Sequence, residues 1–239
     1  MIDLHCHILP GLDDGALDIE DSVAMAQQAY WDGIGTVCAT PHIRHDHRVA
    51  IEEIAARVEA LERVLAERGV EVGIVPGGEL AETEADGLSD EQLHLVALGG
   101  AGGWLLVEPA PGPLGAGLEE LVERLAARGL HAIVAHPERH AGADFEERLL
   151  ALRDRGCLIQ WTAEFVARAS AGDLVPRLAQ EGLVHLLGSD AHSSRAGRPV
   201  QLAEGYERLA LACTPRRLQW IVELAPRAIL RGESVTAMP

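Results

Sequence analysis

The feature that most constrains the fold is a repeated order of helix, glycine and apolar strand along the 239-residue chain. Five stretches with helical periodicity each end in a polar residue and a glycine, and an apolar segment follows at once. A glycine in this place suits the left-handed conformation just past a helix C-terminus. The five glycines are Gly33, Gly69, Gly129, Gly156 and Gly182. The pattern therefore predicts helices and strands in strict alternation.

Seven strands are predicted in all, because an apolar segment also opens the chain and another follows the glycine run at 99–103. Their ranges are 2–6, 34–42, 70–79, 103–108, 130–136, 157–164 and 183–192. Apolar strands that alternate with helices indicate a parallel sheet covered on its faces. Seven such units predict an α/β barrel of the TIM type, one unit short of eight, with a doubly wound open sheet as the alternative. No linker divides the chain, so we expect one domain over residues 1–239.

Composition excludes several classes of protein. The formal net charge of −17 argues against a nucleic-acid ligand, because phosphate backbones attract basic surfaces. No apolar run approaches the roughly 20 residues that a membrane span needs, and a strand that begins at residue 2 leaves no room for a signal peptide. Four scattered cysteines without a CxxC pair predict a reduced, cytoplasmic protein. Whether the chain forms a homo-oligomer stays open.

Six of the seven predicted strands end in histidine or carboxylate residues. In a parallel barrel these ends meet at one face, where active sites lie. Alternate residues of a strand share a face, so His5 and His7 project together, and the Asp-Asp-Gly turn after them brings a further carboxylate within reach at a sharp bend at Gly15. The predicted metal ligands are His5, His7, Asp14, His42, Glu79, Glu108, His136, Asp190 and His192.

Nine ligands exceed the four to six of a single divalent ion and suit two or three ions. Imidazole and carboxylate without thiolate favour manganese, iron or zinc over copper. A lone histidine at a strand end is more often a solvated or capping residue, but six strand ends in one pattern favour a joint site. We expect His45 and His47 to be solvated or to face the substrate. The other histidines, at 94, 131, 140 and 185, are assigned to the core or the surface.

Two arginines follow strands that carry predicted ligands. Arg139 and Arg198 could each hold an anionic substrate through paired hydrogen bonds, with a surface salt bridge as the plain alternative. Multiple metals beside two arginines suit the hydrolysis of a phosphomonoester. The spacing Cys38-x5-Arg44 also matches cysteine-dependent phosphatases, but Pro41 lacks an N–H and the loop has no glycine. We therefore predict that Cys38 is not a nucleophile.

Taken together, these motifs resemble the PHP (polymerase and histidinol phosphatase) superfamily. The residues that carry the resemblance are His5-x-His7, Thr40-Pro41-His42, Glu79, His136-Pro137-Glu138-Arg139 and Ser189-Asp190-x-His192. The opening MIDLHCHILPGLDDG, Glu108 and the late Gly-Arg-Pro are similar to the CpsB/YwqE branch of metal-dependent bacterial protein tyrosine phosphatases. The resemblance covers residues 1 to about 231.

The resemblance implies a distorted TIM-like (β/α)7 PHP barrel with three divalent metal ions, manganese first and iron or zinc as alternatives. It implies that three sets of ligands hold the ions, with Arg139 and Arg198 on the substrate phosphate. The sets are His5, His7, Glu79 and Asp190; Glu79, Glu108 and His136; and Asp14, His42 and His192.

The implied activity is that of a protein tyrosine phosphatase in which a metal-bound hydroxide attacks the phosphate. Its partner would be the tyrosine-phosphorylated tail of a kinase that governs capsule or exopolysaccharide synthesis. The alternatives are a phosphatase of small molecules such as histidinol phosphate, and a non-catalytic protein that binds phosphopeptides. A proofreading nuclease fits the charge poorly. The chain departs from its relatives at 161–164 and 193–196, which we place at the rim of the site.

Overall fold

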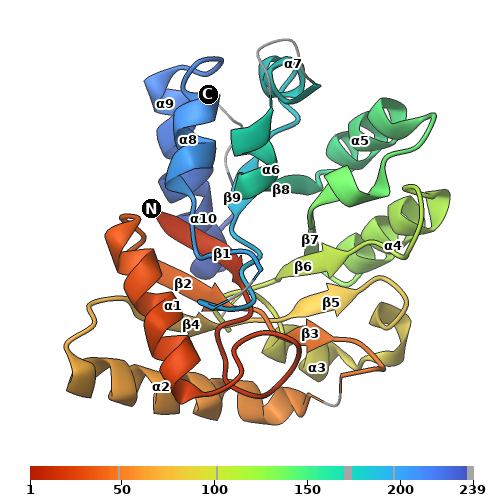
Figure 1. Cartoon of the computed structure of the whole chain (residues 1–239). Helices are drawn as coiled ribbons and strands as arrows, with labels where there is room; N and C mark the ends of the chain where they lie inside the picture. The colour runs from red at the N-terminus through yellow and green to blue at the C-terminus, as the bar shows by residue number, and fades with distance from the viewer. Residues whose placement is uncertain (48, 101, 170–173, 196, 236–239) are drawn as a thin grey trace.

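Parallel strands curl into a barrel-like sheet with helices around its outside in the computed structural model (Figure 1), which describes residues 1–47, 49–100, 102–169, 174–195 and 197–235. One sheet has the order β1-β2-β4 and the other the order β3-β5-β6-β7-β8-β9. A parallel bridge between Cys6 and Ala191 links the end of β1 to the chain after β9. The strands are β1 (Ile2–Cys6), β2 (Thr36–Ala39), β3 (His42–Ile43), β4 (Gly73–Pro76), β5 (Glu79–Ala81), β6 (Trp104–Glu108), β7 (His131–Val134), β8 (Leu158–Thr162) and β9 (Leu186–Gly188). The predicted α/β class and TIM-like curl are confirmed.

Two predicted strands are each broken into two. The predicted strand 34–42 becomes β2 and β3, and the predicted strand 70–79 becomes β4 and β5. Pro41 has no N–H for the first ladder. At the second break, a Cβ on Gly77 would lie 2.7 Å from Cys38 Sγ, so only glycine lets the chains approach this closely. Beyond the breaks β3 pairs with β5 and sets His42 directly beside Glu79.

The helices follow the predicted order. They are α1 (Ile19–Trp31), α2 (Ile54–Arg68), α3 (Asp90–Leu95), α4 (Ala116–Ala127), α5 (Phe145–Asp154), α6 (Ala163–Arg168), α7 (Leu174–Gln180), α8 (Ala203–Leu209), α9 (Pro215–Gln219) and α10 (Ala225–Leu230). Short helical turns lie at η1 (Ile51–Glu53), η2 (Ala85–Gly87), η3 (Pro137–His140) and the π-helical η4 (Trp220–Leu224). All five predicted glycines have φ between +67° and +81°, which confirms the turn chemistry. Among the described residues, no helix is long and apolar enough to cross a membrane.

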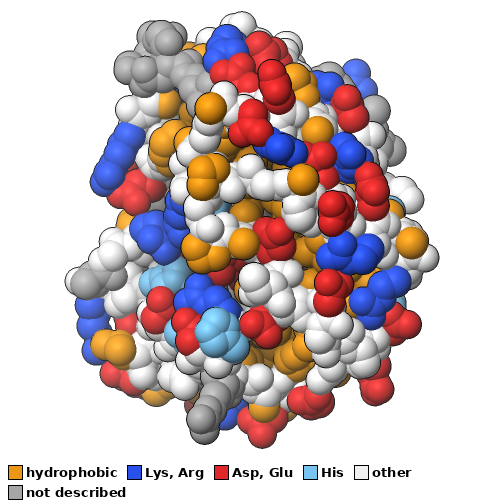
Figure 2. All heavy atoms as spheres, turned by 90° about the vertical axis from the view of Figure 1, so that its right-hand side faces the viewer, with side chains coloured by type: hydrophobic (Ala, Val, Ile, Leu, Met, Phe, Trp, Pro, Cys, Tyr) orange, Lys and Arg blue, Asp and Glu red, His pale blue; other side chains and the backbone are white. Residues whose placement is uncertain are grey.

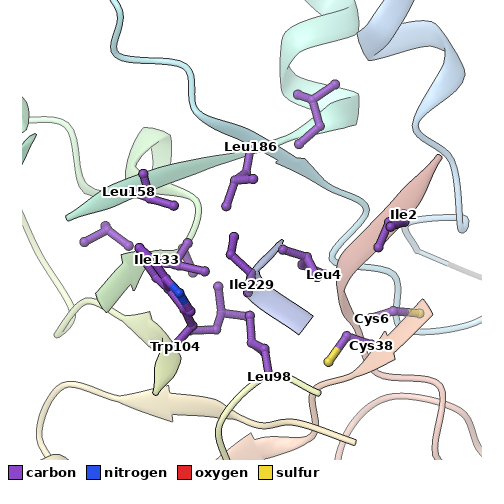
Figure 3. Packing of buried hydrophobic residues seen from close by; sticks show 14 of the residues in the cluster. Ile2, Leu4, Cys6, Cys38, Leu98, Trp104, Ile133, Leu158, Leu186 and Ile229 are labelled. Atoms are coloured by element: carbon purple, nitrogen blue, oxygen red, sulfur yellow. The ribbon is translucent and has the colours of Figure 1, made fainter. Parts of the chain in front are cut away.

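The apolar core fills the inside of the curled sheet and extends between the sheet and the helices around it. Figure 3 shows Leu4 of β1, Ile133 of β7 and Leu186 of β9 directed toward Ile229 of α10. All four side chains are buried. Helix α10 therefore closes one end of the core, and the polar strand ends are left to the other end.

Asp3 fixes β1 to the chain after β9 beneath those strand ends. Its Oδ1 accepts hydrogen bonds from the N–H groups of His5 and Ser189, each at 3.1 Å. Burial raises the pKa of Asp3 to about 6, against the lowering effect of the bonds from Ser189 and His5. The buried carboxyl group of Asp3 thus holds β1, which carries His5, in register with the chain after β9, which carries Asp190.

His185 is a core histidine, as predicted. Its Nδ1 accepts a hydrogen bond from Ile159 N at 3.2 Å, and its ring lies near Trp220. Burial lowers the pKa of His185 to about 4, helped by the charges of Arg217 and Arg153. The folded protein therefore holds this ring neutral at pH values where the unfolded chain protonates it.

His185→Gln should reduce the acid sensitivity of folding. The folded pKa lies below the unfolded value of about 6.5, so the stability that neutral His185 contributes is present above pH 6.5 and lost as pH falls toward 4. The wild type should lose about 3 kcal/mol more than the variant between pH 7 and pH 4. Urea unfolding of both proteins across this range, in chelator, measures the difference. A difference that does not change with pH would contradict the assignment.

Candidate metal centre

All nine predicted ligands lie together at the C-terminal ends of the strands. Among the described residues, four overlapping groups have ligand atoms within 4.8 Å of one another. The groups are His7, Asp14, His42 and His192; His5, His136 and Asp190; His5, His7 and Glu79; and His42, Glu79 and Glu108. They contain all nine predicted residues and no other. Ligands spaced in this way can share ions at bond lengths of about 2.0–2.2 Å.

The first two histidines are oriented from behind. His5 Nδ1 donates to Gln160 Oε1 at 2.9 Å, and His7 Nδ1 donates to Asp13 Oδ2 at 2.8 Å. Each bond leaves the Nε2 lone pair facing the cluster, where the two Nε2 atoms lie 3.3 Å apart. A partner on the outer nitrogen is the usual support for a metal-ligating histidine. The pair is therefore built to present two lone pairs to one place.

Sequence reasoning missed the two supporting residues. Asp13 adjoins the predicted ligand Asp14 in the Asp-Asp-Gly turn, and sequence alone does not tell which carboxylate faces the histidine. Asp13 Oδ2 also accepts from His42 N at 2.9 Å, so it joins two ligand-bearing segments. Gln160 could have been noticed in the sequence, because it is a polar residue inside the apolar strand β8. In the structure it is fully buried.

Several buried ligand atoms have no hydrogen-bond partner. His42 Nδ1, Glu79 Oε2 and His136 Nδ1 are in this state. His42 Nδ1 and Glu79 Oε2 lie 2.9 Å apart but do not form a hydrogen bond of acceptable geometry. Buried polar atoms normally find partners. Lone pairs that converge without a hydrogen bond fit the coordination of a cation, and on this observation the residues fit the predicted metals.

The backbone is strained at two ligand positions. His136 has φ +29° and Asp190 has φ +50°, and these are the two residues other than glycine with positive φ in the described chain. Such conformations cost on the order of 1–3 kcal/mol and persist where the surroundings enforce them. Each residue lies two positions beyond the end of its strand, β7 or β9, so the strained turn there directs its side chain into the cluster.

The charges of the cluster depend on one another. Burial would lower the pKa of His5, but the negative charges of Glu79 and Asp190 outweigh it and raise this pKa. Burial would raise the pKa of Glu79, yet the charge of His5 and the hydrogen bond with His136 hold it well below its ordinary value. The carboxylates thus draw positive charge toward the imidazoles. A divalent cation would supply that charge in place of protons.

The cluster carries an excess of negative charge. Five carboxylates lie in it or against it: Asp13, Asp14, Glu79, Glu108 and Asp190. Three guanidinium groups reach them: Arg44 contacts Glu108, while Arg139 and Arg198 both contact Asp190. With neutral histidines the balance is negative and would repel a phosphate. Protons on the histidines or bound cations would have to offset this charge before the face binds an anion.

The two predicted substrate arginines reach the cluster itself. Arg139 NH2 donates to Asp190 Oδ2, and Arg198 lies 3.2 Å from the same oxygen. Both side chains are partly exposed, so they border solvent on one side and the ligands on the other. Histidine and arginine side chains indeed adjoin one another, with carboxylates around them, on the face in Figure 2. The two guanidinium groups that contact Asp190 Oδ2 are therefore placed to bind an anion there.

The ligand sets expected from the resemblance are only partly reproduced. The first set lies together, with His5 Nε2 3.4 Å and His7 Nε2 3.6 Å from Asp190 Oδ1. The third set lies together and gains His7. No group contains both Glu108 and His136, because Glu108 joins His42 and His136 joins His5 and Asp190. How the ions divide the nine residues stays a prediction.

The two histidines of the loop after β3 behave differently. The His45 side chain is 77% exposed, as expected, with its Nδ1 3.3 Å from Glu84 Oε1. His47 is only partly exposed and stacks on His42 with ring centroids 5.1 Å apart. His47 therefore covers a predicted ligand and is less exposed than His45, and a role facing the substrate stays a prediction for it.

One segment placed at the rim belongs to the core. Trp161 is fully buried, donates from Nε1 to Leu183 O at 3.0 Å and packs against Phe145. The second segment does lie at the surface, where Ser194 N donates to Asp21 Oδ1 at 2.9 Å and Arg195 pairs with Asp18. These bonds tie the chain between His192 and Arg198 to the start of α1. Ala196 lies outside the described residues.

The chain bends at residues 12–15, as expected, and Gly15 is required there for space. Its φ is not positive, but a Cβ there would lie 2.2 Å from His7 O and 2.5 Å from His7 Cβ. The close approach to His7, and not a left-handed backbone, is therefore the reason for glycine in this bend. The Asp-Asp-Gly turn packs directly on a ligand.

Gly15→Ala should displace His7 and weaken manganese binding by at least about tenfold, in the range of losses seen when a ligand is misoriented. Calorimetric titration of the metal-free protein with manganese measures the affinity. Gly87→Ala is the matched control, because a Cβ at Gly87 meets nothing within 4 Å. Equal affinity in the two variants would show that the turn does not position His7.

Comparison with known proteins points to one family. The family model for capsular polysaccharide synthesis, CpsB/CapC, matches residues 1–231. The chain is 35% identical over 203 residues to the tyrosine-protein phosphatase YwqE of Bacillus subtilis, covering 81% of this chain and 78% of that one. It is 27% identical over 217 residues to the tyrosine-protein phosphatase CpsB of Streptococcus agalactiae, covering 87% and 88%.

A solved structure shares the architecture over almost the whole chain. It belongs to a study of YwqE from Bacillus subtilis and CpsB from Streptococcus pneumoniae, described as unique metal-dependent tyrosine phosphatases. The TM-score is 0.84 at 26% identity, and the match covers 99% of this chain and 96% of that one. The predicted family is confirmed by these findings.

Proposed function

We propose, from the premise that this chain belongs to the CpsB/CapC family, that it is a metal-dependent phosphatase that removes phosphate from tyrosine residues of proteins. The observation that carries the proposal is that nine candidate ligands lie in one cluster and that two arginines contact one of them, Asp190. Relatives named as tyrosine-protein phosphatases support the same activity, and so does the solved structure described as that of metal-dependent tyrosine phosphatases.

The four ligand groups would hold the cations, with His5, His7, His42 and Glu79 each shared between two groups. Bound divalent ions would lower the pKa of a coordinated water and offset charge on the phosphoryl oxygens. Nine oxygen and nitrogen ligands suit three ions, and the mixture without thiolate supports manganese, with iron or zinc as alternatives.

The side chains of the protein position the substrate around those ions. Arg139 and Arg198 would exchange contacts with Asp190 for hydrogen bonds to the phosphate, because an incoming dianion competes for the same donors. Ser193, Ser194 and Arg195 hold the segment that leads to Arg198 against α1. The guanidinium group is therefore presented from an anchored loop, which favours a defined approach of the phosphate.

A tyrosine leaving group suits this site. The phenolate has a conjugate acid pKa of about 10, far below that of a serine alkoxide, so departure needs little help from a general acid. The described side chains at the cluster are candidate ligands, arginines and the supporting residues Asp13, Gln160 and His47, and we assign none of them as a general acid. We propose accordingly that phosphotyrosyl chains, such as the tail of a kinase of capsule or exopolysaccharide synthesis, are the substrates.

Cysteine chemistry does not compete with this proposal. Burial raises the pKa of the Cys38 thiol to about 12, so the reactive thiolate is absent at neutral pH. Cys38 Sγ donates to Pro76 O at 3.4 Å inside the sheet. The match to a cysteine-phosphatase spacing is thus accidental. All four cysteines are free, which supports the proposed cytoplasmic location.

Substitutions within the cluster should distinguish metal-dependent hydrolysis from hydrolysis by a cysteine nucleophile. His136→Ala and Asp190→Asn should each lower kcat on a phosphotyrosyl peptide by at least about a hundredfold, since each removes a candidate ligand, and a chelator should do the same. Cys38→Ser should stay within about twofold of the wild type. Phosphate release measures all four, with added manganese for the three variants and without it for the chelated wild type. A Cys38→Ser protein that keeps its metal but loses turnover would contradict the proposal.

Substrate preference distinguishes the protein phosphatase from its small-molecule rival. With manganese, kcat/KM for a phosphotyrosyl peptide should exceed that for histidinol phosphate by at least about tenfold, because the peptide offers a better leaving group and further contacts. Side-by-side turnover at equal enzyme concentration measures the ratio. A preference for histidinol phosphate would replace the proposed substrate, and binding of the peptide without release would indicate a non-catalytic protein.

A further inference from the structure

A cavity of about 360 Å³ lies directly beside the metal-ligand cluster. It is formed by the chain that follows β3, β5, β6 and β7, and its walls include Glu108 and Arg139. Glu108 is a candidate metal ligand and Arg139 a candidate phosphate ligand, so the cavity is continuous with the place where a phosphate would bind. Its volume lies at the lower end of the range for small-molecule sites, about 300–1,000 Å³. That is room for a single ring-bearing side chain and not for a large cofactor.

The walls of the cavity are largely apolar although the neighbouring cluster is charged. Ala81, Pro109, Ala110 and Pro111 line it from two consecutive strand ends. Pro109 and Ala81 are buried, whereas Pro111 is exposed at the mouth. An apolar wall next to a phosphate site recognises the part of a phosphomonoester that carries no charge. The proline rings and alanine methyl groups offer flat surfaces to an aromatic ring.

Hydrogen bonds hold this wall in place. Glu82 N donates to Glu108 O at 2.8 Å, and Ala110 N donates to Glu82 Oε2 at 2.8 Å. Further along the same loop, His140 Nδ1 donates to Gly112 O at 2.9 Å. The loop after β6 is thereby fixed to β5 on one side and to η3 on the other. A pocket whose walls are fixed before binding loses little entropy when it is filled.

Arg44 completes the cavity on the side of β3. Its guanidinium group donates from Nε to Asp46 Oδ1 at 2.6 Å and from NH1 to Glu108 Oε2 at 3.3 Å. The group is therefore restrained at the cavity wall with its charge partly balanced. A planar guanidinium group in this position can pack on the face of an aromatic ring.

We propose that this cavity receives the aromatic ring of the phosphotyrosine and selects aryl over alkyl phosphomonoesters. The inference rests on the proposed function and adds the residues that set its specificity. With the phosphate at Arg139, the remainder of the substrate must leave the cluster, and the cavity that shares Arg139 receives a ring attached directly to the phosphate. An alkyl phosphate of serine has no ring to fill the space between Pro109 and Arg44.

The test uses two phosphonates that are not hydrolysed, so that binding is measured apart from turnover. In the manganese-loaded protein, calorimetry should give an affinity for phenylphosphonate at least about tenfold above that for methylphosphonate, the gain expected from burial of a ring. Ala110→Phe should abolish this preference by filling the cavity and leave the affinity for methylphosphonate within about twofold. Thr83→Trp, at an exposed position of the same wall, should reduce the preference for phenylphosphonate without destabilising the fold.

Ala56→Trp is the matched control, because Ala56 is exposed on α2 and does not line the cavity. A phenyl preference that survives in both cavity variants would overturn the inference. So would a loss that is confined to phosphotyrosyl peptides, since the cavity would then bind a neighbouring side chain. A wild type that prefers phenylphosphonate but releases no phosphate from any phosphotyrosyl peptide would support the ring site and reject the proposed function alone.

Discussion

The structure depends on the repulsion among carboxylates that the chain gathers into one cluster, which is buried at Glu79 and Asp190 and open to solvent at Asp14. Glu79 is fully buried and lies within 3.3 Å of ring nitrogens from His5, His7, His42 and His136. Such a group is tolerated only where positive charge surrounds it. Imidazoles, arginines and the proposed cations supply this charge together. The fold also keeps two features that cost free energy locally, the strained backbone at His136 and Asp190 and the buried carboxyl group of Asp3. Both help to hold the charged groups in place.

The supporting residues connect that cluster to the rest of the molecule. Asp13 holds His7 and the backbone of His42, while Asp21 and Asp18 hold the loop that leads to Arg198. The wall beside Glu108 is fixed in turn by Glu82. Hydrogen bonds and ion pairs between loops therefore position the ligands, the arginines and the wall of the neighbouring cavity. The groups proposed for catalysis and those proposed for substrate selection are held by the same set of contacts.

Sequence reasoning predicted the strand ends well, because parallel strands in alternation with helices must bring their C-terminal ends to one face. It thus identified all nine residues of the cluster and the five helix-ending glycines. It did not predict the split of two strands, at Pro41 and at Gly77. The lack of an N–H at Pro41 was a local signal for the first break, whereas the break at Gly77 reflects close packing against Cys38, which is distant in sequence. Trp161 was misplaced at the rim for the same reason, as its contacts come from residues remote in sequence. The extent of the domain, residues 1–239, stays a prediction, in line with one apolar core from Ile2 to Ile229.

The nine residues should hold several divalent ions at once. Anomalous diffraction from crystals grown with manganese locates each ion directly and counts it by occupancy. We expect three manganese peaks per chain, each within bonding distance of at least three of the nine residues. A single ion, or ions bound elsewhere while the cluster is filled by protons, would contradict this expectation.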